Sequence, residues 1–198
     1  MLVSVTVDGE KILMEEGRNL FSELRDRGYD VPGLCYYEKV SPTGACRLCI
    51  VKRAGKIETA CTMNVEKGMN LEVFTPELEE YRKEILYLIL SEHKHDCMVC
   101  EAAGECDLEK LAYRYHINVS NEVYPQVYDR NLTSDTNQVL IFDPQKCIKC
   151  YRCVKACDEI QEKHVLDMAY RSNGMIVWPG LGIWRESECD GCGECIQS

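Results

Sequence analysis

The chain has 198 residues, of which 45% are hydrophobic and 8% aromatic, and its formal net charge is −10. This acidic balance argues against a nucleic-acid or anionic-membrane surface, because such surfaces need clustered Lys and Arg. No apolar run approaches the roughly 20 residues that cross a bilayer, and the first residues lack the basic and apolar regions of a secretory signal. We therefore expect a cytoplasmic location, where the fourteen cysteines favour metal binding over disulfides.

Residues 1–75 are predicted to form a small mixed domain. Alternating apolar residues on both sides of Asp8 and Gly9 indicate a β-hairpin. A helix is expected over Leu20–Arg27, with Asn19 as its N-cap. The remaining predicted elements are a long loop and three short strands, at residues 31–49, 50–52, 56–59 and 71–74. Hairpin, helix, long loop and closing strands in this order predict a β-grasp ferredoxin.

Residues 76–118 are predicted to be helical. Thr75 is a suitable N-cap, Pro76 suits the first turn, and the helix is expected to continue to about Glu92. Its predicted buried face consists of Leu78, Tyr81, Ile85, Leu88 and Ile89. A second, shorter helix is indicated by the spacing of Leu108, Leu111, Ala112 and Tyr115. Residues 119–138 lack periodicity and are expected to be an extended linker.

The first cysteine set suits a [2Fe-2S] cluster. Its members are Cys35, Cys46, Cys49 and Cys61, spaced C-x10-C-x2-C-x11-C. A plant-type [2Fe-2S] site shares the C-x2-C pair and the distant fourth cysteine, although its first gap is shorter. Gly44, in the stretch SPTGACRLC, is suited to a loop that folds tightly over a cluster. A structural zinc site with four thiolates is the alternative.

The second set suits a [4Fe-4S] cluster with one histidine ligand. Its members, spaced H-x3-C-x2-C-x5-C, are His93, Cys97, Cys100 and Cys106. Three thiolates leave one iron of a cubane without a ligand, and an imidazole from the end of the preceding helix can reach it. His95 competes for this role but lies too close to Cys97, whereas His116 and His164 are interpreted as ordinary surface or hydrogen-bonded histidines. A zinc knuckle with three cysteines and one histidine is again the alternative.

The last segment, 139–198, is predicted to be a ferredoxin-like domain with two [4Fe-4S] clusters. The run CIKCYRCVKAC has the bacterial spacing C-x2-C-x2-C-x3-C, in which the fourth cysteine binds the other cluster of the pair. One site, called the Cys157 site, is then Cys157, Cys189, Cys192 and Cys195. The other, called the Cys147 site, has Cys147, Cys150 and Cys153. Its fourth ligand is expected at position 199. Either the chain is truncated just before that ligand, which we favour, or this cluster is three-coordinate, labile or lost.

The order of these motifs, SPTGACRLC, then HKHDCMVCEAAGECDL, then CIKCYRCVKAC, resembles the N-terminal iron-sulfur region of the G-type subunit of complex I. It is also similar to the small diaphorase subunit of NAD-reducing hydrogenases and to the N-terminal extension of [FeFe]-hydrogenase and NAD-linked formate dehydrogenase catalytic subunits. The resemblance covers essentially the whole chain. The family pattern H-P-x-D-C-x2-C-x5-C places its histidine ligand at His93, with Lys94 in place of the usual proline. The family's last motif continues into C-P-x-G-A, which implies a cysteine at position 199.

Complex I forms often lack the equivalents of Cys157 and the CDGCGEC triplet, so this chain resembles the soluble hydrogenase and formate dehydrogenase branch more closely. The resemblance implies a relay of single electrons between an NAD(P)H-oxidising flavoprotein and a catalytic hydrogenase or formate dehydrogenase subunit, in a hetero-oligomeric complex. No glycine-rich nucleotide motif is recognisable, so flavin and NAD are expected on the partner. Two alternatives are the N-terminal arm of a longer catalytic polypeptide and a zinc-stabilised scaffold.

Overall fold

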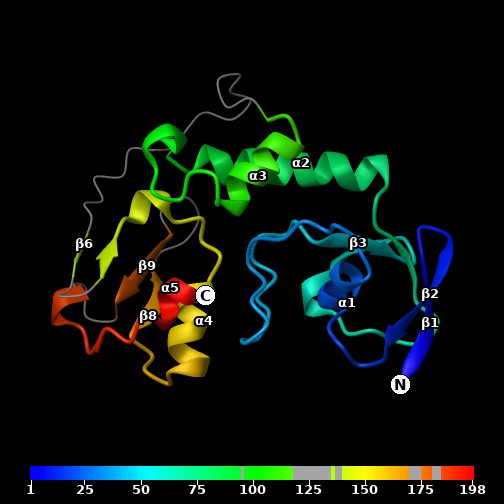
Figure 1. Ribbon diagram of the computed structural model, residues 1–198, viewed down its shortest axis with the longest axis horizontal. Helices are drawn as coiled ribbons and strands as arrows, with labels where there is room; N and C mark the ends of the chain where they lie inside the picture. The colour runs from blue at the N-terminus through cyan, green and yellow to red at the C-terminus, as the bar shows by residue number, and fades with distance from the viewer. Residues whose placement is uncertain (95, 118–134, 137–139, 170–174, 180–183) are drawn as a thin grey trace.

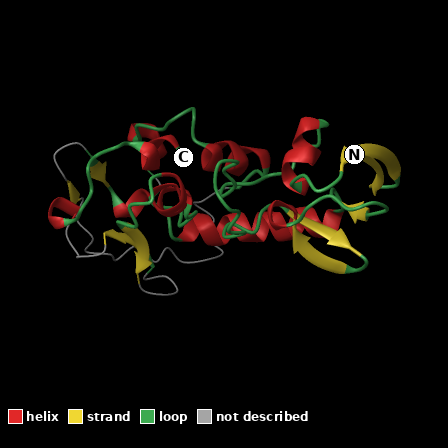
Figure 2. Cartoon of the chain, turned by 90° about the horizontal axis from the view of Figure 1, so that it is seen from below, coloured by secondary structure: helices red, strands yellow, loops and turns green. Residues whose placement is uncertain are grey.

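The computed structural model describes residues 1–94, 96–117, 135–136, 140–169, 175–179 and 184–198. Two lobes lie at opposite ends of the molecule, and helices α2 and α3 lie along one side (Figure 1). Strands gather at both ends, with helices and loops between them (Figure 2). The architecture is α+β, as predicted. Within the described residues, no helix is long and apolar enough to cross a membrane.

The N-terminal lobe contains a five-stranded sheet in the order β2-β1-β5-β3-β4. Strands β1 and β5 are parallel, and the other neighbouring pairs are antiparallel. The strands are Leu2–Val7 (β1), Glu10–Glu15 (β2), Ile50–Arg53 (β3), Lys56–Thr59 (β4) and Asn70–Glu72 (β5). Helix α1, Leu20–Asp26, packs Phe21 and Leu24 into the same hydrophobic cluster as Val5 of β1. This arrangement is the predicted β-grasp.

Side-chain hydrogen bonds set the limits of α1 and β5. The Asn19 carboxamide oxygen accepts two backbone N–H groups from the first turn of α1, at 3.0 and 3.3 Å, so the helix begins where the sequence predicts. Strand β5 is shorter than the predicted strand over 71–74, because it ends at Glu72. The next two backbone N–H groups donate to the Asp8 carboxylate instead of continuing the ladder.

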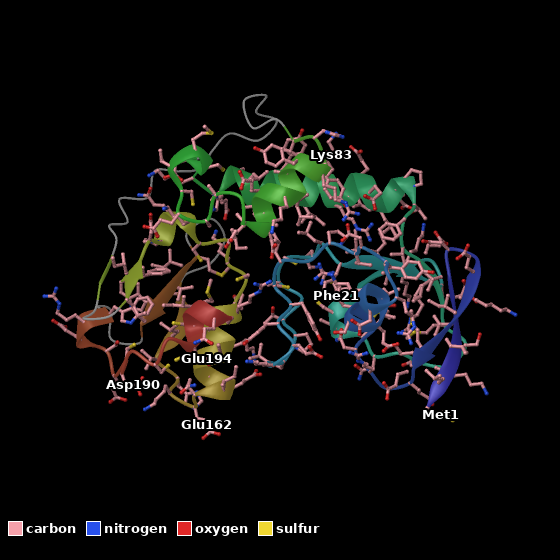
Figure 3. All side chains as sticks on the ribbon, in the orientation of Figure 1. Met1, Phe21, Lys83, Glu162, Asp190 and Glu194 are labelled. Atoms are coloured by element: carbon pink, nitrogen blue, oxygen red, sulfur yellow. The ribbon has the colours of Figure 1, made fainter. Side chains whose placement is uncertain are left out.

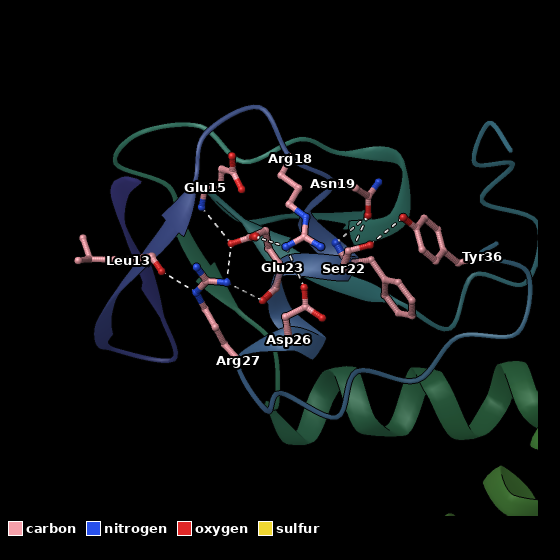
Figure 4. A network of polar contacts seen from close by, with 10 residues as sticks. Leu13, Glu15, Arg18, Asn19, Ser22, Glu23, Asp26, Arg27 and Tyr36 are labelled. Carbon is pink, nitrogen blue, oxygen red and sulfur yellow. Dashed lines mark hydrogen bonds and ion pairs between the residues drawn. The ribbon is translucent and has the colours of Figure 1, made fainter. Parts of the chain in front are cut away.

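A buried carboxylate joins α1 to the hairpin (Figure 4). Glu23 is 1% exposed and accepts a hydrogen bond from the backbone N–H of Glu15 at 3.0 Å. Its oxygens also pair with the guanidinium groups of Arg18, at 2.8 Å, and Arg27, at 2.6 Å. Burying a carboxylate is costly unless it is paired and hydrogen-bonded, and these three partners meet that requirement.

Helix α2, Pro76–Ser91, begins as predicted, with the Thr75 hydroxyl accepting a backbone N–H of the first turn at 3.3 Å. Its predicted apolar face is confirmed only in part. Leu78 is buried and Ile85 and Ile89 are partly buried, whereas Tyr81 and Leu88 are 44% and 53% exposed. The buried residues are Leu78, Arg82, Leu86 and Leu90. These four residues are spaced four apart and so lie on one face of the helix. Because one of them is an arginine, a search for apolar residues does not find this face.

Helix α3, Asp107–Arg114, packs against α2 through the predicted face. Leu108 is buried, and Leu111, Ala112 and Tyr115 are partly buried against the same cluster. Leu86 and Leu90 of α2 belong to the same cluster, together with Leu34 and Leu48 of the loop after α1. The two helices therefore pack against each other and against the cysteine-bearing loop of the N-terminal lobe.

The C-terminal lobe is built from short elements. They are Asp135–Thr136 (β6), Ile141–Phe142 (β7), Arg152–Lys155 (α4), a π-helical turn at Ala156–Ile160, Leu166–Ala169 (β8), Ile176–Pro179 (β9) and Glu194–Gln197 (α5). Strands β8 and β9 form an antiparallel pair that the sequence analysis did not place. The predicted linker, 119–138, lies outside the described residues except for the short strand β6.

Candidate metal centres

Four cysteines from separate segments meet beside the N-terminal sheet. Cys35 and Cys46 lie in the long loop after α1, Cys49 directly precedes β3, and Cys61 lies in the 3-10 turn Ala60–Thr62. The Cys35 side chain is within hydrogen-bonding reach of Cys46 and Cys61, and Cys61 also reaches Cys49. The structure thus brings together all four residues of the predicted [2Fe-2S] site, called here the [2Fe-2S] site.

These four thiols cannot all ionise without a compensating positive charge. The contacts from Cys46 and Cys61 lower the pKa of Cys35. The contact with Cys35 raises the pKa of Cys46, and contacts with Cys35 and Cys49 raise the pKa of Cys61. A bound metal supplies positive charge and deprotonates its thiol ligands. The donor set therefore fits a thiolate-bound metal group.

The loop that carries Cys46 folds tightly over the site. Gly44 has a φ of +63°, and a Cβ atom at this position would lie 3.1 Å from the Thr62 Cγ2 atom. Both the dihedral angle and the close approach favour glycine, as the sequence analysis expected. The Leu34 backbone N–H donates to Cys46 Sγ at 3.4 Å, and such bonds stabilise a ligating thiolate.

Sequence reasoning missed one residue beside this site. Arg82 of α2 is fully buried and donates to the carbonyl oxygens of Leu48, at 3.2 Å, and Ile50, at 2.6 Å. These carbonyls flank Cys49. The signal in the sequence is the spacing of four between Arg82 and the buried leucines on each side of it along α2.

His93 and three cysteines line one cavity after α2. His93 follows the helix end, Cys97 begins the 3-10 turn Cys97–Val99, and Cys106 is the N-cap of α3. Together with Cys100 they line a cavity of about 500 Å³ that is partly open to solvent. Burial and the nearby Glu109, Cys106 and Cys100 raise the pKa of Cys97. The four residues of the predicted group, called the His93 site, thus line the same cavity, whereas the competing His95 lies outside the described residues.

The Cys147 site faces the same cavity. Cys150 and Cys153 line it together with Ser198. Burial raises the pKa of Cys153 to about 12, with smaller contributions from the nearby Cys150, Cys147 and Cys195. Cys147 therefore also lies close to Cys153. The Lys149 backbone N–H donates to Cys147 Sγ at 3.4 Å. The His93 and Cys147 sites are therefore neighbours across one cavity.

All four residues of the Cys157 site line a second, much smaller cavity, of about 20 Å³. They are Cys157, Cys189, Cys192 and Cys195. Apolar side chains of Val165, Leu166 and Trp184 form much of the remaining wall. Burial and the three other cysteines of the site raise the pKa of Cys195 to about 11. Four thiols in an apolar enclosure again suit a metal group that deprotonates them.

The cysteines are thus grouped by proximity and by shared cavities. All fourteen lie in described segments, and none of them forms a disulfide. Among the described residues, no three His, Cys, Asp or Glu side chains surround one point as the ligands of a single metal ion do. His116 and His164 lie outside the groups, and the exposed His164 ring pairs with Asp158.

Polar contacts join the lobes near these sites. The Glu159 carboxylate, on the π-helical turn that carries Cys157, accepts the Ser41 backbone N–H at 2.6 Å and also the Ser41 hydroxyl. Lys149 pairs with Glu92 at the end of α2. Arg114 of α3 pairs with Asp30 at 2.9 Å. The cysteine-bearing loops of the two lobes are therefore held against each other.

Two family models match the chain. The model described as a 2Fe-2S iron-sulfur cluster binding domain matches residues 1–76. The model described as the NADH-ubiquinone oxidoreductase-G iron-sulfur binding region matches residues 82–121. The first match contains the [2Fe-2S] site and the second contains the His93 site. The chain thus contains a [2Fe-2S]-binding domain and a [4Fe-4S] region.

The chain is also similar to whole proteins. It is 32% identical to the gamma subunit of the NAD-reducing hydrogenase HoxS of Cupriavidus necator over 86% of this chain and 73% of that subunit. It is 32% identical to the alpha subunit of the NADPH-Fe(3+) oxidoreductase of Geobacter sulfurreducens over 98% of this chain but only 23% of that subunit. A chain in the crystal structure of an NAD+-reducing [NiFe]-hydrogenase in the H2-reduced state matches with a TM-score of 0.85 and 25% identity, over 94% of this chain and 80% of that chain. The chain belongs to the family of iron-sulfur electron-transfer proteins that includes the gamma subunit of the NAD-reducing hydrogenase and the G-type subunit of NADH-quinone oxidoreductase.

Proposed function

We propose that the chain relays single electrons between an NAD(P)H-oxidising flavoprotein and a separate catalytic centre of the hydrogenase or formate dehydrogenase type. It would do so as one component of a hetero-oligomeric cytoplasmic complex. The observation that carries the proposal is the convergence of cysteines from distant segments into separate groups along one chain. The names of the relatives, an NAD-reducing hydrogenase and an NADPH-Fe(3+) oxidoreductase, support the choice of electron donor.

Our assignment is one [2Fe-2S] and three [4Fe-4S] clusters. Cys35, Cys46, Cys49 and Cys61 bind the first, and His93, Cys97, Cys100 and Cys106 bind the second. The Cys157 site uses all four of its cysteines. The Cys147 site uses Cys147, Cys150 and Cys153, and its fourth ligand is a cysteine that follows Ser198. The position of Ser198 in the wall of that cavity supports this assignment. The corresponding domains are 1–75, 76–118 and 139–198, with 119–138 as a linker.

Bound iron-sulfur clusters supply one-electron chemistry that needs no bond breaking in the protein. The residues of the chain hold and tune them. Thiolates bind iron, and the backbone N–H groups of Leu34 and Lys149 reach ligand sulfurs at 3.4 Å, where they reduce the negative charge felt at the metal. His93 is neutral when it binds metal, so it removes one negative charge relative to a thiolate and raises the potential of its cluster.

A second candidate is that this sequence forms the N-terminal arm of a longer catalytic polypeptide. The alignment with the Geobacter sulfurreducens relative supports it, because this chain matches 23% of that subunit's length. The two candidates share the same electron relay. They differ in whether the catalytic centre is on the same polypeptide, which the coding sequence after Ser198 and the mass of the native chain would distinguish.

Metal analysis and redox titration of the intact complex test the relay. We expect about 14 iron atoms and acid-labile sulfide per native chain, for one [2Fe-2S] and three [4Fe-4S] clusters. Electron paramagnetic resonance during the titration should resolve one [2Fe-2S] signal and separate [4Fe-4S] signals. Zinc without acid-labile sulfide would overturn the proposal in favour of a scaffold.

Replacing His93 by alanine tests the ligand assignment. We expect H93A to shift or abolish one [4Fe-4S] signal and to leave the [2Fe-2S] signal unchanged. The matched control is H116A, which removes an exposed imidazole outside the cysteine groups. An unaltered spectrum in H93A would transfer the ligand role to another group, such as His95.

A further inference from the structure

We propose that Arg82 is a positioning residue of the [2Fe-2S] site: its buried guanidinium group fixes the backbone around Cys49 and raises the reduction potential of the cluster. The proposal rests on the assigned [2Fe-2S] ligand set. It adds a residue from α2, outside the segment matched by the 2Fe-2S family model, which ends at residue 76.

The backbone around Cys49 is held from two directions. Arg82 donates to the carbonyl oxygens of Leu48 and Ile50, the residues on either side of Cys49. Leu48 and Cys49 form the turn that leads into β3, and Ile50 is the first residue of that strand, so one guanidinium group holds both the turn and the start of the strand. The intervening Cys49 carbonyl accepts the Ala60 backbone N–H at 2.8 Å, next to Cys61. The position of Cys49 is thus fixed by α2 on one side and by the turn that carries Cys61 on the other.

The charge of Arg82 is not screened by water. Its side chain has 0% exposure, and it contacts two carbonyl groups, the Glu79 carboxylate and the face of the Phe74 ring, whose centroid lies 5.5 Å from the guanidinium carbon. Glu79, in contrast, is 35% exposed, so solvent weakens its opposing charge. A net positive charge therefore remains in the low-dielectric interior beside the cysteine loop.

This charge has a defined effect on electron uptake. Reduction adds one electron, and therefore one negative charge, to the cluster, with no bond made or broken. A nearby buried positive charge stabilises the reduced form more than the oxidised form, because electrostatic interactions are strong in the interior. Arg82 thus raises the midpoint potential, and Glu79 lowers it by opposing Arg82.

The test compares midpoint potentials of the [2Fe-2S] signal in the intact complex. We expect R82M to lower the potential and R82K, which keeps the charge, to restore most of it. We expect E79Q to raise the potential, because it removes the opposing charge from a partly exposed position without leaving a buried cavity. The matched control is K83M, since Lys83 is the next residue on α2 and extends away from the N-terminal lobe (Figure 3).

Each outcome has a clear meaning. A purely structural role for Arg82 predicts that R82K, which keeps the charge but loses the guanidinium hydrogen bonds, lowers the potential as much as R82M does, and that result would overturn the inference. An unchanged potential in E79Q would overturn it as well. If R82M does not fold, E79Q and R82K decide the question, because both keep the charge of residue 82. Absence of any [2Fe-2S] signal from the wild-type complex would instead overturn the proposed ligand set, so the two failures are distinguishable.

Discussion

The two lobes bury their cysteines to different degrees. In the N-terminal lobe, Cys35, Cys49 and Cys61 are buried, and two of them belong to a hydrophobic cluster of sixteen buried residues. In the described part of the C-terminal lobe, the seven cysteines are partly buried or exposed, and the corresponding cluster has five buried residues. Helices α4 and α5 there have only four residues each.

This difference indicates two sources of stability. Burial of apolar area stabilises the β-grasp lobe whether or not a metal is bound. Helices α4 and α5 are too short to persist on their own, even though α4 continues into the π-helical turn, because helix nucleation is costly. If the proposed ligands bind their clusters, the ligand bonds supply the stability that this lobe lacks. We infer that the clusters hold the C-terminal lobe together, whereas the N-terminal lobe holds its cluster.

Removal of iron should produce the largest difference in stability between the two lobes. We expect an iron-free chain to lose amide protection across the C-terminal lobe while the N-terminal sheet keeps most of its protection, because metal binding and folding are coupled only where no other core exists. Hydrogen exchange measured by mass spectrometry before and after iron removal tests this. Equal loss of protection in both lobes would contradict the comparison.

Loss of one ligand should have a smaller effect within the C-terminal lobe. C157S should abolish or shift the signal of the cluster held by Cys189, Cys192 and Cys195 and leave the Cys147-site cluster in place, because Cys157 lines the cavity of the former group. Electron paramagnetic resonance and iron content measure the result. Loss of the Cys147-site signal with an intact Cys157-site signal would show that the cross-pairing is wrong.

Substitution of Glu23 should weaken only the N-terminal lobe. E23Q removes the charge that pairs with Arg18 and Arg27 in a side chain that is 1% exposed, so we expect a loss of about 1–3 kcal/mol. The free energy of unfolding is measured by chemical denaturation, with hydrogen exchange of the β1 and β2 amides as the readout. E16Q, at an exposed position of the same lobe, is the control and should have no measurable effect.

The contact between Glu159 and Ser41, which joins the two lobes, should contribute least to stability. Lys155 and Ser41 lower the pKa of Glu159 from its ordinary 4.5 to about 2. A carboxylate with a lowered pKa stabilises the fold above its ordinary pKa and loses this contribution as the pH falls through the folded value. We therefore expect protection of the Ser41 amide to be independent of pH between 5 and 8, after correction for intrinsic exchange.

The E159Q variant completes this measurement. It should expose the Ser41 amide to faster exchange without changing the free energy of unfolding of either lobe measurably, since Glu159 is exposed. The control is E162Q, at an exposed residue just after the same turn. A large loss of stability in E159Q would mean that the lobes depend on each other for folding.

Local signals made the N-terminal lobe predictable. The turn at Asp8 and Gly9 and the caps at Asn19 and Thr75 each depend on residues a few positions apart, and all are observed. The end of β5 was not predictable in this way, because the side chain that terminates it, Asp8, is 65 residues away from Val73 in sequence.

Residue type misled the prediction for α2. A search for apolar residues selected Tyr81 and Leu88, which are exposed, and passed over Arg82, which is buried. Arginine is almost never fully buried unless it is paired, and its partners here are backbone carbonyls before and within β3, which the α2 sequence does not reveal. The close C-x2-C pairs and triplets were easier to predict as neighbours, because their spacing places them on one loop, whereas Cys35, Cys61 and Cys157 lie far in sequence from the other members of their proposed groups.

The length of α2 has a consequence for electron flow. Arg82 contacts the backbone beside Cys49, and the helix continues without a break to Ser91, two residues before His93. At 1.5 Å per residue, this part of the helix spans roughly 14 Å. A helix, unlike a loop, keeps its length when the surrounding chain changes. The distance between the proposed [2Fe-2S] and His93 sites is thus set by a helix with a fixed number of turns. This distance can stay constant while the partner proteins on either side vary.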